Sequence, residues 1–175
     1  MSKNPTPVIR KATAADASLL TELGERTFYE TFAADNTEED MRQYLAASFS
    51  PEKQSSELAD PFTTFLIVEI DHTVTGYAML RAAPPPNEPD ALRSIELVRF
   101  YVCKEWHGRG IAQDLMRACL EQAREQGYAT VWLGVWEHNA RARSFYRKLK
   151  FEEFGEHAFQ LGNDVQNDVL MRISC

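Results

Sequence analysis

The sequence has few of the residues that cross-link chains or hold metals. Its three cysteines, Cys103, Cys119 and Cys175, form no Cys-x-x-Cys pair. An odd count without such a pair argues against a disulfide framework or a zinc site, and favours a reducing cytoplasm. The four histidines are scattered at spacings that give no ligand pair on a helix. We therefore expect no metal.

Long apolar runs and an excess of basic charge are also missing. No stretch reaches the roughly 20 apolar residues that span a membrane. The formal net charge is −7, whereas a nucleic-acid surface needs a basic stripe. A hydrophobic share of 44% and a charged share of 26% are those of a globular protein. We expect a single domain, residues 1–175, that has neither a membrane nor nucleic acid as its partner.

Periodicity and turn residues predict an α/β (α+β) fold with a mixed, mostly antiparallel sheet of about seven strands and about four flanking helices. The helices are expected to begin near Asp16, Thr37, Ile111 and Asn139. The strands are expected at residues 8–10, 65–70, 74–80, 95–102, 130–136, 154–161 and 168–173. The proline-rich stretch 82–91 is predicted to be a loop.

The most informative segment runs from Arg99 to Ala112, where a strand meets a helix through a turn that contains Gly108 and Gly110. Such a turn leaves backbone N–H groups unpaired at the positive end of a helix, so an anion fits there. Arg109 can add charge at its rim. The pattern is neither GxxxxGK[ST] nor GxGxxG, so nucleotide triphosphates and dinucleotides are not favoured. By itself, it also fits a plain strand-to-helix turn.

Two motifs carry a family resemblance. His107-Gly-Arg-Gly110-Ile-Ala112 resembles motif A of the GNAT superfamily (GCN5-related N-acetyltransferases), Gln/Arg-x-x-Gly-x-Gly/Ala. Asn139 to Phe151 resembles the downstream family segment Asn-x-x-Ala-x-x-Phe/Tyr-Tyr-x-Lys-x-Gly-Phe. His107 replaces the usual Gln or Arg. Lys150 replaces the glycine that ends the last helix, so that cap is expected to form without the usual left-handed residue.

The resemblance implies the GNAT fold and acetyl-CoA as co-substrate. The amides of residues 108 to 112, which are Gly108, Arg109, Gly110, Ile111 and Ala112, would hold the CoA pyrophosphate beside His107. The backbone of Phe100, Tyr101 and Val102 would pair with the pantetheine arm between two strands that splay apart. Gly134 would ease close approach to this gap. Asn139 would touch the pantetheine or substrate region, cap its helix, or do both.

Two residues are candidates for proton transfer. Tyr146 falls on the tyrosine that lies near the sulfur in the family, where its phenol suits protonation of a departing thiolate. The alternative is a half-buried core tyrosine with its hydroxyl at the surface. Glu96 falls where some members place a general base that acts through water. The two-residue period puts it on the same side as Phe100, facing away from Arg99. The alternative is a surface glutamate at a strand end.

No residue set indicates covalent catalysis, so the amine is expected to attack directly in a ternary complex. The segments 27–32, 132–137 and 162–168 resemble those of the Pai-type bacterial polyamine acetyltransferases, which implies a polyamine acceptor. The additional ammonium groups of a polyamine would form exposed ion pairs with Glu25, Glu30 and Asp35, which lie on or just after the first helix. Another acceptor (an amino acid, an aminoglycoside-like drug or a protein N-terminus) and a non-catalytic acetyl-CoA sensor remain alternatives. The family often dimerises, so a homodimer is compatible.

Overall fold

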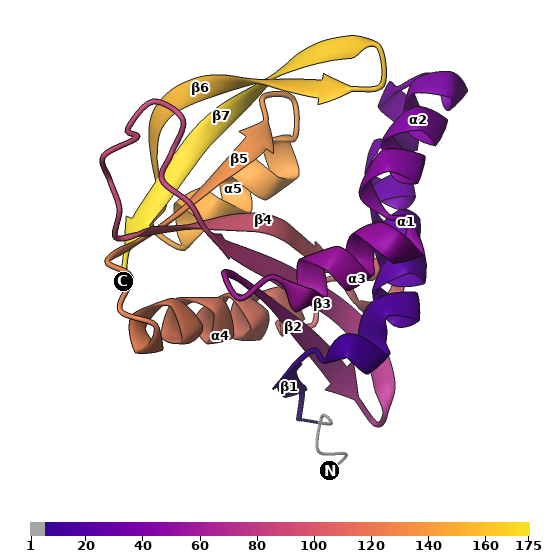
Figure 1. Ribbon diagram of the computed structural model, residues 1–175, viewed down its shortest axis with the longest axis horizontal. Helices are drawn as coiled ribbons and strands as arrows, with labels where there is room; N and C mark the ends of the chain where they lie inside the picture. The colour runs from indigo at the N-terminus through magenta and orange to yellow at the C-terminus, as the bar shows by residue number, and fades with distance from the viewer. Residues whose placement is uncertain (1–5) are drawn as a thin grey trace.

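Seven strands pair into one sheet in the order β1-β2-β3-β4-β5-β7-β6 (Figure 1). This computed structural model describes residues 6–175, so residues 1–5 of the predicted domain lie outside it. The strands are β1 (Val8–Lys11), β2 (Thr63–Ile70), β3 (Thr73–Ala82), β4 (Ser94–Val102), β5 (Thr130–Trp136), β6 (Glu152–Leu161) and β7 (Asp164–Ser174). The β4–β5 pair is parallel and the other five are antiparallel, which confirms the predicted mixed sheet.

Helices cover both faces of this sheet. Those of the described residues are α1 (Ala17–Phe32), α2 (Glu38–Ser48), α3 (Pro51–Ala59), α4 (Ile111–Glu125) and α5 (Ala140–Lys148). Side chains of α1 and α3 pack on one face, and those of α4 and α5 pack on the other. None of the helices within residues 6–175 is long and apolar enough to cross a membrane.

The expected count of about four helices was one too low, because α3 was missed. Its start carries clear signals: the Ser50 hydroxyl accepts a hydrogen bond from the Lys53 N–H at 3.2 Å, and Pro51 occupies the first turn. The nine residues are mostly polar, so they give no apolar stripe that marks a helix in the sequence. The side chains that turn toward the protein are Gln54, Glu57 and Leu58.

Strands β4 and β5 pair at only three positions. Ser94, Ile95 and Glu96 face Thr130, Val131 and Trp132, after which the strands diverge (Figure 1). Beyond this point β4 stays paired with β3, and β5 stays paired with β7. The predicted splaying is therefore confirmed. Between the two strands lie free edges formed by residues 97–102 and 133–136.

A β-bulge interrupts the alternation of side chains in β4. The register against β3 shifts so that Met79 faces Arg99 while Leu80 faces Leu97. Val98 is therefore left without a partner, which is the defining feature of a bulge. Val98 and Arg99 therefore lie on the same face, and from Arg99 onward each side chain lies on the face opposite to the one that strict alternation assigns.

This bulge overturns the predicted orientation of Glu96. Leu97 and Phe100, three residues apart, both pack on the face covered by α4 and α5. Glu96 and Arg99 therefore lie together on the face covered by α1 and α3. Glu96 pairs there with Arg81 of β3, and Arg99 pairs with a carboxylate of α3. The prediction that Glu96 shares a side with Phe100 and faces away from Arg99 is wrong.

The hairpin of β6 and β7 reaches across to α2. The N–H of Asn163 at its tip donates to Asp40 Oδ1 at 2.7 Å, and Gln166 Nε2 donates to Asn36 Oδ1 at 2.6 Å. Figure 1 shows this tip beside the end of α2. The segment before and within α2 and the tip of the β6–β7 hairpin thus meet on the side of the cavity away from α5.

Candidate active site

A cavity of about 510 Å³ lies where β4 and β5 separate. Its walls come from the free parts of both strands, from α5, and from the meeting place of α1 and α2 with the β6–β7 hairpin. Aromatic rings dominate the side away from α5: Phe28, Phe32, Tyr44, Phe49, Tyr101, Trp136 and Phe159. Among the predicted residues, Glu96, Phe100, Tyr101, Asn139 and Tyr146 line this cavity.

A second cavity of about 210 Å³ lies at the turn before α4. Gly108 and Gly110 there have φ angles of +77° and +80°, a left-handed conformation that favours glycine. A Cβ at either position would meet no protein atom within 4 Å, so open space lies beside the turn. The first bond of the helix runs from the Asp114 N–H to the Gly110 carbonyl at 3.2 Å. The N–H groups of Ile111 and Ala112 precede it and remain available to an anion.

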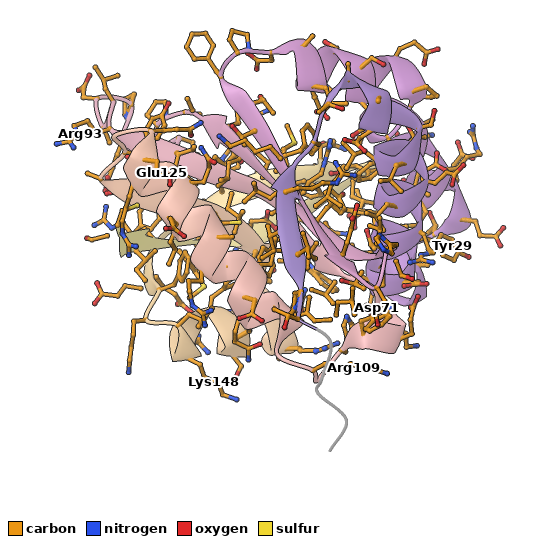
Figure 2. The ribbon with its side chains drawn as sticks, turned by 90° about the horizontal axis from the view of Figure 1, so that it is seen from below. Tyr29, Asp71, Arg93, Arg109, Glu125 and Lys148 are labelled. Atoms are coloured by element: carbon orange, nitrogen blue, oxygen red, sulfur yellow. The ribbon has the colours of Figure 1, made fainter. Side chains whose placement is uncertain are left out.

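His107 and Arg109 frame this turn. His107 Nε2 lies 2.7 Å from the carbonyl oxygen of Val102, so this nitrogen donates and holds the turn against the end of β4. The guanidinium of Arg109 stacks over Trp106, 4.7 Å from the ring centre. Figure 2 shows Arg109 at the surface beside the start of α4. Val102, His107, Gly108, Gly110, Ile111 and Ala112 all line the small cavity.

Both ends of α5 fix the position of Tyr146. At the first end, Asn139 Oδ1 accepts a hydrogen bond from the Ala142 N–H at 3.1 Å, so Asn139 caps the helix while it lines the cavity. At the other end, the Phe151 N–H donates to the Tyr146 carbonyl at 3.0 Å. The Tyr146 ring contacts Phe100 and Phe151 and is 8% exposed. Burial raises its pKa above the usual value, so the phenol is protonated at neutral pH.

Lys150 differs from the expected cap. The cap was predicted to form without a left-handed residue, but Lys150 itself has φ +73°. Its N–H donates to the Arg147 carbonyl at 3.0 Å, and together with the Phe151 bond this forms a Schellman motif. A non-glycine residue in this conformation costs roughly 1 kcal/mol. The buried Phe151 side chain holds the motif in place.

Glu96 reaches the cavity with a partner already bound. Its Oε2 accepts a hydrogen bond from Arg81 Nη2 at 2.8 Å across the β3–β4 pair, and its side chain is 19% exposed. Arg99, the other arginine in the wall, is paired in the same way with Glu57 of α3 at 2.8 Å. Both guanidinium charges in the cavity wall are thus neutralised by carboxylates.

Asp168 is a cavity residue whose role sequence reasoning missed. It lies on β7 directly opposite Trp136 of β5 and His157 of β6. A Cβ on Gly134 would lie 3.1 Å from Asp168 Oδ2, so the carboxylate occupies the space above this glycine. Burial raises the pKa of Asp168 to about 6, and the charge of His157 offsets part of this rise. Within residues 6–175 its carboxylate has no ion-pair partner. The available signal was Gly134, a glycine inside a strand.

Comparisons with known proteins agree with this geometry. The family model described as "Acetyltransferase (GNAT) family" matches residues 25–151. The chain belongs to the GNAT family. It is an N-acetyltransferase that uses acetyl-CoA as its co-substrate, and the open, N–H-rich turn before α4 suits the pyrophosphate of that molecule.

Two relatives are similar over most of their length. An uncharacterized N-acetyltransferase of Lactobacillus delbrueckii subsp. lactis is 35% identical over 150 residues, which cover 86% of this GNAT chain and 87% of the relative. Another from Mycobacterium tuberculosis (strain H37Rv) is 33% identical over 156 residues, or 89% and 96% of the two chains.

Solved structures share the fold. The PaiA N-acetyltransferase of Thermoplasma acidophilum in complex with coenzyme A superposes with a TM-score of 0.78 at 22% identity, over 97% of this chain and 99% of that one. The ribosomal-protein-alanine N-acetyltransferase of Brucella melitensis gives a TM-score of 0.66 at 24% identity, over 96% and 99%. At these identities the likeness establishes the fold of the GNAT chain and leaves its acceptor open.

Replacing Gly110 by Asp should abolish the thermal stabilisation by acetyl-CoA. The wild-type enzyme should gain several degrees in Tm at millimolar acetyl-CoA if the affinity is about micromolar. In the variant, a carboxylate on a left-handed residue would enter the turn that faces the pyrophosphate. Gly127→Asp is the matched control, because Gly127 is also left-handed, in open space, and follows the opposite end of α4. An equal response of both variants to acetyl-CoA would contradict the assignment.

Replacing Asp168 by Asn should stabilise the fold at neutral pH. Because the pKa of Asp168 is about 6 rather than 3.8, the native state holds a proton between pH 4 and 6 that the unfolded chain has lost. Wild-type stability therefore falls as pH rises through this window, and the loss is constant above it. We expect a gain on the order of 1 to 2 kcal/mol at pH 8 that vanishes near pH 4, after discounting for partial exposure. Urea unfolding at several pH values measures it, and a pH-independent difference would refute it.

Proposed function

We propose that this enzyme acetylates a primary amine of a small cationic acceptor, with a polyamine such as spermidine as the first candidate. The observation that carries the proposal is the charge balance of the cavity at the β4–β5 gap. Its two arginines are paired with Glu96 and Glu57, and the Asp168 carboxylate is left over. Aromatic rings with one uncompensated carboxylate suit an ammonium group on an apolar chain.

Only two of the three sequence features that favoured a polyamine still support it once the structure is considered. Glu25, Glu30 and Asp35 lie exposed on the surface and line no part of the cavity, so they cannot hold an acceptor inside it. The net charge of −7 and the resemblance to the Pai-type enzymes still favour a polycation. Inside the cavity, the single unpaired carboxylate of Asp168 supports the binding of one ammonium group.

The binding of acetyl-CoA is assigned to two adjoining regions. The backbone N–H groups of residues 108 to 112 would hold the pyrophosphate, with Arg109 at the rim and His107 keeping the turn in place. The free edge of β4 at residues 100–102 would hydrogen-bond the pantetheine arm as a neighbouring strand does. Asn139, at the cavity wall, would lie beside the end of that arm.

The transfer proceeds by direct attack of the amine on the thioester that acetyl-CoA supplies. The nitrogen forms a bond to the carbonyl carbon, and the carbon–sulfur bond breaks. An N–H on the free edge of β4 near Phe100 would donate to the carbonyl oxygen as it gains charge. Tyr146, protonated and held beside the gap, would donate to the departing sulfur. The products are an amide and the free thiol.

Replacing Tyr146 by Phe should lower kcat by roughly ten- to a thousandfold while the affinity for acetyl-CoA stays nearly intact. The variant keeps the ring that packs on Phe100 and Phe151 and loses only the hydroxyl. Tyr128→Phe is the control, because Tyr128 packs against the same core and lines neither cavity. Steady-state kinetics and a binding titration measure the two effects. An unchanged kcat would show that water protonates the sulfur and that Tyr146 is structural.

A panel of amines tests the acceptor. Spermidine or spermine should give the highest kcat/KM, measured by CoA release, against a neutral-bodied monoamine, an amino acid, an aminoglycoside and a peptide. The KM for spermidine should rise with ionic strength, because salt screens the attraction between its outer ammonium groups and the carboxylates of the protein surface. A better non-polyamine substrate would replace the polyamine assignment. If acetyl-CoA binds but no amine of the panel causes CoA release, the result would indicate a non-catalytic acetyl-CoA sensor.

A further inference from the structure

Two carboxylates on the same face of the sheet reach the cavity. That of Glu96 is ion-paired, whereas that of Asp168 has no ion-pair partner within residues 6–175. Glu96 lies where β4 and β5 are still paired, opposite Trp132, and its Oε2 is engaged by Arg81. Asp168 lies over the part of β5 that has left β4. With a rise of about 3.3 Å per residue, Gly134 is roughly 7 Å further along the gap than Trp132. Of the two, only Asp168 therefore lies over the part of β5 that no longer pairs with β4.

Asp168 lines the cavity beside the two tryptophans of β5. Leu133 and Val135 point to the α4 face, so Trp132, Gly134 and Trp136 share the face of Asp168. Because Gly134 has no side chain, the Asp168 carboxylate lies directly above it, between the two tryptophans. Trp132 is held by a bond from its Nε1 to the Ala83 carbonyl at 2.8 Å. Trp132, Trp136 and the Asp168 carboxylate thus line the same part of the cavity.

We propose that Asp168 is the catalytic residue that binds the acceptor's ammonium group and takes its proton, in place of Glu96. This inference rests on the proposed function and names the residue of the acceptor site. An ammonium ion in the cavity beside Asp168 would meet the carboxylate in a wall rich in aromatic rings, which together favour a cation.

The raised proton affinity of Asp168 fits this role. A carboxylate with a pKa of about 6 accepts a proton from an ammonium ion roughly a hundredfold more readily than one at 3.8. His157 on β6 and Tyr44 on α2 are the titratable groups that affect or are affected by the charge of Asp168. The remaining titratable groups of the cavity wall are Arg81, Glu96, Arg99, Tyr101 and Tyr146.

Two protons leave the acceptor nitrogen during the reaction. One proton of the ammonium group passes to Asp168, which frees the nitrogen lone pair for attack on the thioester carbon. As the carbon–sulfur bond breaks, Tyr146 gives its proton to the sulfur, and the second proton that the nitrogen loses passes through water to the Tyr146 phenolate. Asp168 releases its proton to solvent after the products leave. Each turnover yields one amide, one thiol and one proton.

The test compares three variants with the wild type in two measurements. Asp168→Asn removes the base, Glu96→Gln removes the other carboxylate of the cavity, and Asp164→Asn removes a charge from the same strand outside the cavity. The first measurement is kcat/KM for spermidine between pH 5 and 9. The second is calorimetric binding of spermidine to the protein loaded with CoA, which needs no turnover.

For Asp168→Asn, we expect a fall of kcat/KM by about a hundredfold or more, loss of the decline below about pH 6, and spermidine binding at least about tenfold weaker. Glu96→Gln should keep the decline at low pH, and Asp164→Asn should match the wild type. The proposal is overturned if Asp168→Asn keeps both the low-pH decline and spermidine binding, or if Glu96→Gln is the variant that loses them.

The two proposals can fail separately. If the wild type acetylates no amine of the panel, the proposed function fails, and the binding measurement decides the site alone. Spermidine binding that is lost in Asp168→Asn then supports an ammonium site at Asp168. Equal binding by both proteins, or no binding by the wild type, overturns it.

Discussion

The parting of β4 from β5 after three paired residues is the constraint on which the rest of the site depends. Each strand keeps its other neighbour, β3 for β4 and β7 for β5, so the gap is held open from both sides without any insertion. Unpaired backbone groups on a strand edge are costly when buried and have to find a partner. An extended, amide-bearing chain such as the pantetheine arm of acetyl-CoA would supply one under the proposed binding mode.

The bulge at Val98 adds a second consequence. It turns Arg99 toward α3, where the guanidinium pairs with Glu57 and stacks 4.7 Å from the centre of the Phe49 ring. At 9% and 10% exposed, these two side chains tie the helices of the acceptor side to β4. A buried pair of this kind contributes little net stability, but loss of one partner leaves an uncompensated charge. The orientation of the α1–α3 layer relative to the gap is therefore fixed.

Sequence reasoning succeeded where the signal was local and failed where it depended on a neighbour. The turn at residues 107–112 and the cap at Asn139 are specified by adjacent residues, so their geometry agreed with prediction. The orientation of Glu96 depends on the register against β3, which alternation within β4 does not contain. Asp168 becomes distinctive only because β5 and β6 flank it, with Gly134 beneath. Moreover, it lies beyond residues 25–151, the part that the family model describes.

The two sides of the cavity come from different segments of the chain. The side proposed to face acetyl-CoA comes from one continuous stretch, β4 through α5. The side proposed for the acceptor joins residues 36–40 to the β6–β7 hairpin through Asp40–Asn163 and Asn36–Gln166. Substitutions in the two terminal segments can thus reshape the acceptor wall while the donor side keeps its form. Because the segments touch, a change in one is expected to require a compensating change about 120 to 130 residues away. Divergence of acceptor specificity in such enzymes would then appear as correlated substitutions in the segment around α2 and in the β6–β7 hairpin.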